Sequence, residues 1–223
     1  MRPTLLGSLV TVVVMFAVSQ TEAQWYFPRA STPTPRVPTP TPTSAAKADT
    51  FQIRYASNLN VGDSVINISN AGTQGGNDPG GNVCANVYVF SPDEQMVACC
   101  ACLVTPDALV SLSARNDLIA NTLTPAVPSS IVIKLLTTVP AGANMTQCDP
   151  SLRKNATLAS GLRAWGTTLH ALPTAGEFGV TETEFSHATL SQSELVQLQS
   201  FCGFIQDDGS GFGMCRTCRA GGQ

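Results

Sequence analysis

Short apolar runs separated by turn residues follow one another through residues 51–223. Alternation of apolar and polar positions with a period of two is typical of a strand with one buried face, and residues 51–55 show it clearly. Residues 83–90 and 96–104 flank a Ser-Pro-Asp-Glu turn, as in a hairpin. The pattern predicts about eight strands, at residues 51–55, 64–68, 83–90, 96–104, 109–112, 131–136, 162–169 and 178–185.

No helical periods alternate with these strands, so a parallel α/β sheet is disfavoured. The pattern instead predicts an all-β domain, an antiparallel sandwich or a jelly-roll-like fold. One C-terminal helix is marked by a capping box, with Ser191 as N-cap and Glu194 three residues on. Leu190 and Leu195 form the matching hydrophobic staple. Cys202, in the later turns of this helix, is placed to lock it onto the sheet.

The first 23 residues are typical of a secretory signal peptide. Arg2 precedes an apolar stretch over residues 5–18, and the small residues Thr21 and Ala23 fit a cleavage site before Gln24. The alternative is an uncleaved anchor, but the run is shorter than the roughly 20 apolar residues that span a bilayer. No later run is long enough to span a membrane, so we expect a secreted, extracellular mature chain without a transmembrane segment.

A Thr/Pro-rich tract lies between the signal and the strands, with alternating prolines over residues 32–42. Proline fixes φ, removes an N–H donor and favours extended geometry in the preceding residue. This composition predicts a semi-rigid polyproline-II spacer. The chain thus divides into a signal peptide (1–23), a linker (24–50) and a β-domain (51–223).

Composition and charge exclude two classes of protein. The chain is 43% hydrophobic and 12% charged, with a net charge of −3. A wholly disordered chain has fewer hydrophobic residues, and a nucleic-acid binder needs a basic field. We therefore expect no nucleic-acid partner, and an extracellular partner or cell-surface material instead.

Eight cysteines lie in the predicted domain and none in the signal or linker. An even number of cysteines in an exported chain predicts disulfides. Two of them are close to the C-terminus, so the tail is predicted to be locked by disulfides. The candidates are Cys84, Cys99, Cys100, Cys102, Cys148, Cys202, Cys215 and Cys218.

Strand parity constrains one disulfide. On a strand, Cys100 and Cys102 share a face. A five-residue hairpin loop sets Cys84 opposite Cys102, and a three-residue loop sets it opposite Cys100. A four-residue loop sets it opposite an alanine and gives no straight cross-strand pair. Cys84 is therefore predicted to bond either Cys102 or Cys100. Cys99 points to the other face and needs a distant partner, such as Cys148 or Cys202.

A competing use of the cysteines is metal binding or redox chemistry. Residues 99–102 with Cys215 and Cys218 supply enough thiolates for zinc. Residues 215–218 also have the CxxC spacing of redox motifs, but they lie in a Gly-rich tail without the βα context of thioredoxin-like proteins. We favour structural disulfides and expect no metal and no other cofactor.

One pair of carboxylates suggests an alternative enzymatic role. Glu182 and Glu184 share a face of the last predicted strand, at about 7 Å. That falls in the range of about 6.5–9.5 Å used by inverting glycosidases. Sugar-binding clefts are rich in aromatic side chains, however, and Trp165 is the only tryptophan of this domain. We favour a solvent-exposed strand face, and we assign no catalytic residue.

Four segments of the chain carry a resemblance to a known family. The run at residues 48–56, the Cys-Cys-Ala-Cys cluster at 99–102, and the segments 202–205 and 209–218 resemble a family of cysteine-rich secreted bacterial proteins, mainly acidobacterial. The resemblance covers about residues 48–223. It implies no activity, so no catalytic residues carry over from it.

The sequence therefore predicts a secreted, non-catalytic extracellular domain with a structural, adhesive or ligand-binding role. Two alternatives remain: a secreted carbohydrate-active hydrolase using Glu182 and Glu184, and an extracellular metal-binding or thiol-redox protein using the cysteines.

Overall fold

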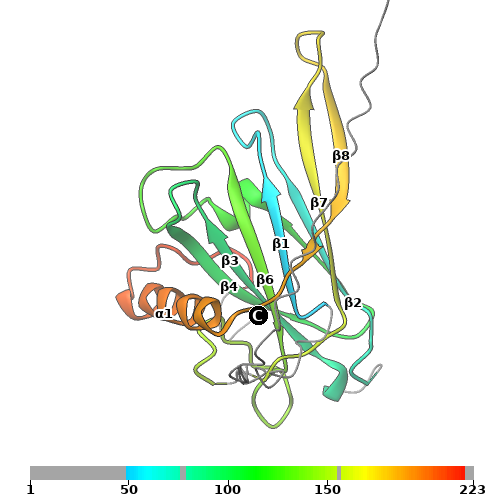
Figure 1. Ribbon diagram of the computed structural model, residues 1–223, viewed down its shortest axis with the longest axis vertical. Helices are drawn as coiled ribbons and strands as arrows, with labels where there is room; N and C mark the ends of the chain where they lie inside the picture. Colours follow the sequence, from blue (N-terminus) through cyan, green and yellow to red (C-terminus); the bar gives the residue numbers. More distant parts are fainter. Residues whose placement is uncertain (1–48, 76–78, 155–156, 219–223) are drawn as a thin grey trace, which may run out of the picture. The chain divides into compact units, whose positions relative to one another are not determined.

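The computed structural model describes residues 49–75, 79–154 and 157–218 (Figure 1). The predicted signal peptide and nearly all of the predicted linker lie outside these residues. The described part confirms the all-β prediction, with two antiparallel sheets and one C-terminal helix. The five-stranded sheet has the order β4 (Met96–Val104), β3 (Val83–Phe90), β6 (Ile131–Thr138), β1 (Phe51–Ala56) and β9 (Ser186–His187). The four-stranded sheet has the order β5 (Leu109–Ser113), β2 (Val65–Asn70), β7 (Leu162–Ala171) and β8 (Phe178–Glu184).

All eight predicted strands are present, and the two-residue β9 is added to them. Two short turns of helix were not predicted, the 3₁₀ turn η1 (Pro79–Gly81) and the π-helical turn η2 (Ala114–Leu118). The helix α1 (Gln192–Asp208) is the predicted one. No helix in the described residues is long and apolar enough to cross a membrane.

The two sheets enclose one large apolar core. Val87, Ile133 and Leu135 from the five-stranded sheet belong to the same buried cluster as Ile68 and Ala164 from the four-stranded sheet. These positions alternate with residues on the outer faces, as in a sandwich. Burial of this apolar surface is the main stabilising contribution to such a fold.

Helix α1 covers the other face of the five-stranded sheet. Leu198 and Ile205 on the helix share a second buried cluster with Phe51, Tyr88 and Leu136 on the strands. β3 and β4 are therefore covered on both faces, which is why their sequences are nearly continuous apolar runs.

The helix begins at the predicted N-cap, and a glycine ends it. Ser191 is the N-cap, and its hydroxyl accepts a hydrogen bond from the Glu194 N–H at 3.1 Å. The Glu194 carboxylate pairs with Lys134 of β6 at 2.6 Å. Gly209 ends the helix in a left-handed conformation with φ of 66°, which favours glycine.

The tail after the helix runs along the edge of β4. The Cys99 N–H donates to the Gly213 carbonyl at 2.8 Å, and the Ala101 N–H donates to the Cys218 carbonyl at 3.2 Å. Met214 bridges Cys99 in parallel orientation. The tail thus satisfies an edge that would otherwise present unpaired backbone groups.

Tyr88 makes the stability of the domain depend on pH in the alkaline range. It is fully buried, and its hydroxyl donates to the Pro150 carbonyl at 2.7 Å. Burial, and secondly the charge of Asp149, raises the pKa of Tyr88 far above its ordinary value. A tyrosine in the unfolded chain ionises at about pH 10, whereas buried Tyr88 stays neutral. The contribution of neutral Tyr88 to the free energy of unfolding is therefore complete below that pH and is lost as the pH rises above it.

We therefore expect the free energy of unfolding to fall as the pH rises past about 10, and Tyr88→Phe to flatten that slope. Urea denaturation between about pH 8 and pH 11 measures it. The control Tyr55→Phe, at an exposed tyrosine, keeps the wild-type slope. An unchanged slope in Tyr88→Phe would show that other groups cause the dependence.

Candidate functional site

The outer face of the four-stranded sheet brings the two predicted glutamates next to the tryptophan of the domain. Glu184 of β8 lies directly opposite Trp165 of β7, and Glu182 lies opposite Thr167. On the other side of β7, Trp165 pairs with Asn67 of β2. Trp165 is therefore flanked by an amide and a carboxylate on adjacent strands. We call this surface the Trp165 face, made up of Asn67, Ser111, Arg163, Trp165, Glu182 and Glu184.

Hydrogen bonds order the polar side chains of the Trp165 face. The Ser111 hydroxyl donates to Asn67 Oδ1 at 2.8 Å. The Asn67 amide nitrogen in turn donates to Glu182 Oε1 at 3.2 Å. Because Asn67 uses both ends of its amide, its orientation and that of Glu182 are fixed across three strands.

Arg163 orders the other end of the face. Its guanidinium lies 3.2 Å from Glu184 Oε1 and 3.1 Å from Asp49 Oδ1. Asp49 also lies 3.2 Å from His187 Nε2. These pairs are partly exposed, so they contribute little stability and mainly fix side-chain orientation.

The Trp165 face is partly exposed: Asn67, Arg163 and Trp165 are half-buried, and none of the hollows found in the described residues lies beside the glutamates. Glu182 and Glu184 are both exposed. The four surface hollows described for residues 49–218 have other linings: one of about 600 Å³ lies between α1 and residues 151–153, and three surround residues 119–130. The aromatic-lined cleft required by the hydrolase hypothesis is not among these hollows.

Sequence reasoning missed the position of Trp165. The signal was available locally, because β7 and β8 form a hairpin and the short connection between them fixes which residues are opposite. Asn67 is different, since it comes from a strand about a hundred residues away in sequence. No local pattern predicts that pairing.

A buried arginine lies beneath this face. Arg54 of β1 reaches from the five-stranded sheet, and its side chain donates to the Thr183 carbonyl and the Thr168 hydroxyl, both at 3.0 Å. It is 7% exposed, and burial lowers the pKa of Arg54 while the charge of Glu182 opposes that shift. The sequence placed Arg54 on a half-buried strand, and the structure shows it inside the sandwich.

Gly166 makes room for Arg54. A Cβ at position 166 would lie 2.3 Å from Arg54 Nε and 2.7 Å from its Cδ. We expect Gly166→Ala to destabilise the domain by about 1–3 kcal/mol, the usual cost of overpacking. Urea denaturation measures the change.

Gly179→Ala in the same hairpin is the matched control, because the nearest atom to an added Cβ there is Leu172 Cδ2 at 3.5 Å. It should cost much less than Gly166→Ala. Equal losses of stability would mean that the cost comes from the glycine backbone and not from Arg54.

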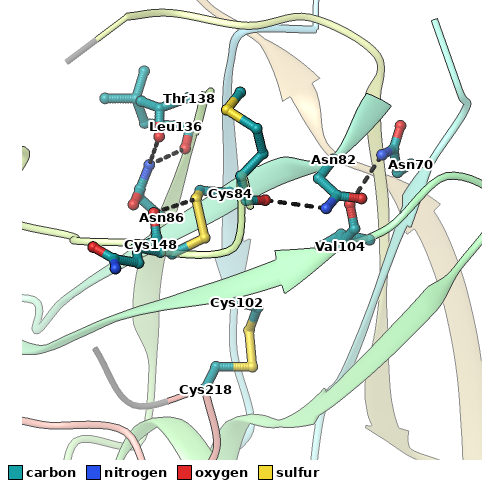
Figure 2. Close-up of a disulfide and its surroundings, with 12 residues drawn as sticks. Asn70, Asn82, Cys84, Asn86, Cys102, Val104, Leu136, Thr138, Cys148 and Cys218 are labelled. Atoms are coloured by element: carbon teal, nitrogen blue, oxygen red, sulfur yellow. Dashed lines mark hydrogen bonds between the residues drawn. A yellow bond between two sulfur atoms is a disulfide. The ribbon is translucent and has the colours of Figure 1, made fainter. Parts of the chain in front are cut away.

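The structure corrects the predicted partner of Cys84. Cys84 bonds Cys148, not Cys102 or Cys100 (Figure 2). The hairpin loop has five residues, the length that would set Cys84 opposite Cys102 in a regular ladder, but the register shifts between Val89 and Phe90, so Cys84 lies opposite Leu103. One extra residue in one strand reverses the parity of everything beyond it.

The other three disulfides tie the C-terminal region to β4. Cys99 bonds Cys202, one of the two distant partners predicted for it, and so locks the helix. Cys100 bonds Cys215 and Cys102 bonds Cys218, which confirms the disulfide-locked tail.

These disulfides leave no thiolate for the metal or redox alternatives. All eight cysteines lie in described residues and all are bonded. A cysteine binds zinc as a thiolate. The two cysteines of the CxxC segment bond different partners and not each other, unlike a redox-active pair. In this oxidised protein all eight cysteine sulfurs are engaged in disulfides. Among the described residues, no group of three or more His, Cys, Asp or Glu side chains is arranged to hold a metal ion.

No protein-family model matches the chain, and a search of curated proteins finds no match. Among solved structures, the crystal structure of Thermotoga maritima 1070 is similar with a TM-score of 0.38 and 10% identity, over 65% of this chain and 99% of that chain. A similarity of this size supports no conclusion about fold or function. The function must therefore be inferred from the Trp165 face itself.

Proposed function

We propose that the chain is a secreted, non-catalytic binding domain that holds an extracellular carbohydrate polymer on the Trp165 face. The observation that carries this proposal is the position of Trp165 between ordered polar side chains on an exposed sheet. An adhesive role follows if that polymer belongs to a cell surface or matrix.

The chemistry of the face suits a sugar. An indole ring gives a flat apolar surface for the C–H face of a pyranose. The amide of Asn67 and the carboxylates of Glu182 and Glu184 supply donors and acceptors for its hydroxyl groups. Because these groups are held by hydrogen bonds before a ligand arrives, binding costs less side-chain entropy.

The shape of the face favours a polymer over a small molecule. Small-molecule sites are concave and enclose most of their ligand. The Trp165 face is formed by neighbouring strands of one sheet, spaced about 4.8 Å apart, and its two glutamates are exposed to solvent. An extended chain that crosses several strands gains contacts that a single sugar does not.

The remaining features support export. Four disulfides are typical of proteins from oxidising compartments. The predicted signal peptide and Thr/Pro-rich spacer would deliver the domain outside the cytoplasm and hold it away from its attachment point.

A pull-down with insoluble polysaccharides and a glycan array test the proposal. We expect saturable binding to at least one polymer, and Trp165→Ala should weaken it at least about tenfold, which corresponds to about 1.4 kcal/mol. Tyr55→Ala is the control, because Tyr55 is an exposed aromatic residue on the other sheet, 61% exposed. Equal losses in both variants, or no binding to any glycan, would contradict the proposal.

The carbohydrate-active hydrolase is the second candidate, and the aromatic ring of Trp165 opposite Glu184 favours it. In the structure Glu182 accepts a hydrogen bond from Asn67 and Glu184 forms an ion pair with Arg163, and neither lies in a cleft described above. We expect incubation with the bound polymer to release no new reducing ends. Release that is lost in Glu182→Gln with Glu184→Gln would establish the hydrolase instead.

A further inference from the structure

β8 presents an unpaired edge at one end of the four-stranded sheet. It has seven residues, and among the described residues it pairs with β7 alone. The corresponding edge of the five-stranded sheet, at β4, is covered by the tail and its disulfides. Exposed strand edges are templates for pairing with another strand.

The ladder shows which backbone groups of β8 face outward. The Phe185 N–H donates to the Ala164 carbonyl at 2.8 Å, and the Leu172 N–H donates to the Glu177 carbonyl at 3.0 Å. Residues bonded to the neighbouring strand alternate along an antiparallel strand, so the odd-numbered residues of β8 bond β7. The N–H and C=O groups of the even-numbered residues Phe178, Val180, Glu182 and Glu184 therefore point to the free edge.

This edge combines apolar and acidic side chains in separate halves. Phe178 is 47% exposed and Val180 is 61% exposed. Glu182 and Glu184 follow in the second half of the strand. The β7–β8 hairpin extends beyond the neighbouring strands, so a second strand can approach it (Figure 1).

We propose that β8 pairs antiparallel with β8 of a second copy of this chain, with Thr181 on the two-fold axis. This register uses all four outward residues in hydrogen-bonded pairs and is self-complementary, as a two-fold interface requires. Val180 of one copy lies opposite Glu182 of the other, and Phe178 lies opposite Glu184. The register with Glu182 on the axis would instead place two carboxylates directly opposite, which is destabilising.

The pairing has a structural consequence for the Trp165 face. A two-fold axis perpendicular to the sheet keeps the outer faces of both copies on the same side. The two four-stranded sheets then form one continuous sheet that carries two Trp165 faces. The pairing itself does not depend on what that face binds.

Sedimentation equilibrium of the exported chain, from about 1 to 500 µM, tests the proposal. We expect a reversible dimer. Val180→Pro should raise its Kd at least about tenfold, because proline removes an N–H that points to the free edge and leaves the bonds to β7 intact. Val180→Thr, which keeps the N–H and the β-branched shape, is the control and should change the Kd much less.

A second variant tests the register and does not depend on whether the proline variant folds. Val180→Lys places a cation opposite Glu182 in each of the two symmetric pairs, and should tighten the dimer about 2- to 30-fold. In the alternative register, with residue 180 on the two-fold axis, the two lysines would lie opposite each other and weaken the dimer. A monomer at every concentration, a dimer unaffected by a folded Val180→Pro, or a dimer weakened by Val180→Lys would overturn the proposal.

Discussion

Reduction of all four disulfides is expected to abolish the cooperative thermal transition of the domain. Each native disulfide of a small secreted domain contributes about 2–5 kcal/mol, and the total stability of a domain is often about 5–15 kcal/mol. Three of the four disulfides attach the helix and tail to β4. Reduction therefore detaches both α1, which covers one face of the five-stranded sheet, and the tail, which covers the edge of that sheet at β4.

Seven of the eight cysteines are buried, so reduction requires excess reductant and gentle warming. Calorimetry then compares the oxidised and reduced protein. EDTA is the control and should leave the melt of the oxidised protein unchanged, since its eight cysteines are bonded to one another in disulfides. A reduced protein that keeps its transition within a few degrees would show that the apolar core alone supports the fold.

Removal of the Cys84–Cys148 disulfide is expected to lower the free energy of unfolding more than removal of the Cys102–Cys218 disulfide does. Cys84–Cys148 joins residues 64 apart, and closing such a loop in the unfolded chain corresponds to about 4 kcal/mol. Cys102–Cys218 spans 116 residues, but the neighbouring disulfide Cys100–Cys215 already holds the tail there. Cys100 is two residues from Cys102 on the strand, and Cys215 is three residues from Cys218 in the tail. The loop that remains to be closed is short, so its loss should cost about 2 kcal/mol or less.

Urea denaturation of Cys84→Ala with Cys148→Ala, and of Cys102→Ala with Cys218→Ala, measures the two losses. Removal of both tail disulfides should then cost more than twice the loss of one, because only then is the segment after Cys202 released from β4. Additive losses for the tail pair would contradict the loop argument.

The strands and the helix could be predicted from the sequence because local residues determine them. Turn residues bound each apolar run, and Ser191 and Glu194 mark the first turn of the helix. Strand parity alone indicated that Cys99 needs a distant partner, and Cys202 is one of the two that the sequence analysis names as examples.

The partner of Cys84 could not be predicted, because loop length fixes the register only when the ladder is regular. The irregularity between Val89 and Phe90 shifts the register by one residue, and loop length does not reveal it. The candidate site was only half predictable for a similar reason. Glu182 and Glu184 are visible in the strand pattern, whereas Asn67 joins them through a long-range pairing of β2 with β7.

Trp165 provides the most direct measurement of the proposed binding function. The chain has two tryptophans, Trp25 and Trp165, so a Trp25→Phe variant leaves Trp165 as the single indole reporter. Titration of this variant with a polysaccharide that it binds should give a saturable change in tryptophan fluorescence, with the same Kd as the pull-down. Binding without any change in Trp165 fluorescence would show that the polymer lies elsewhere and would contradict the Trp165 face as the binding site.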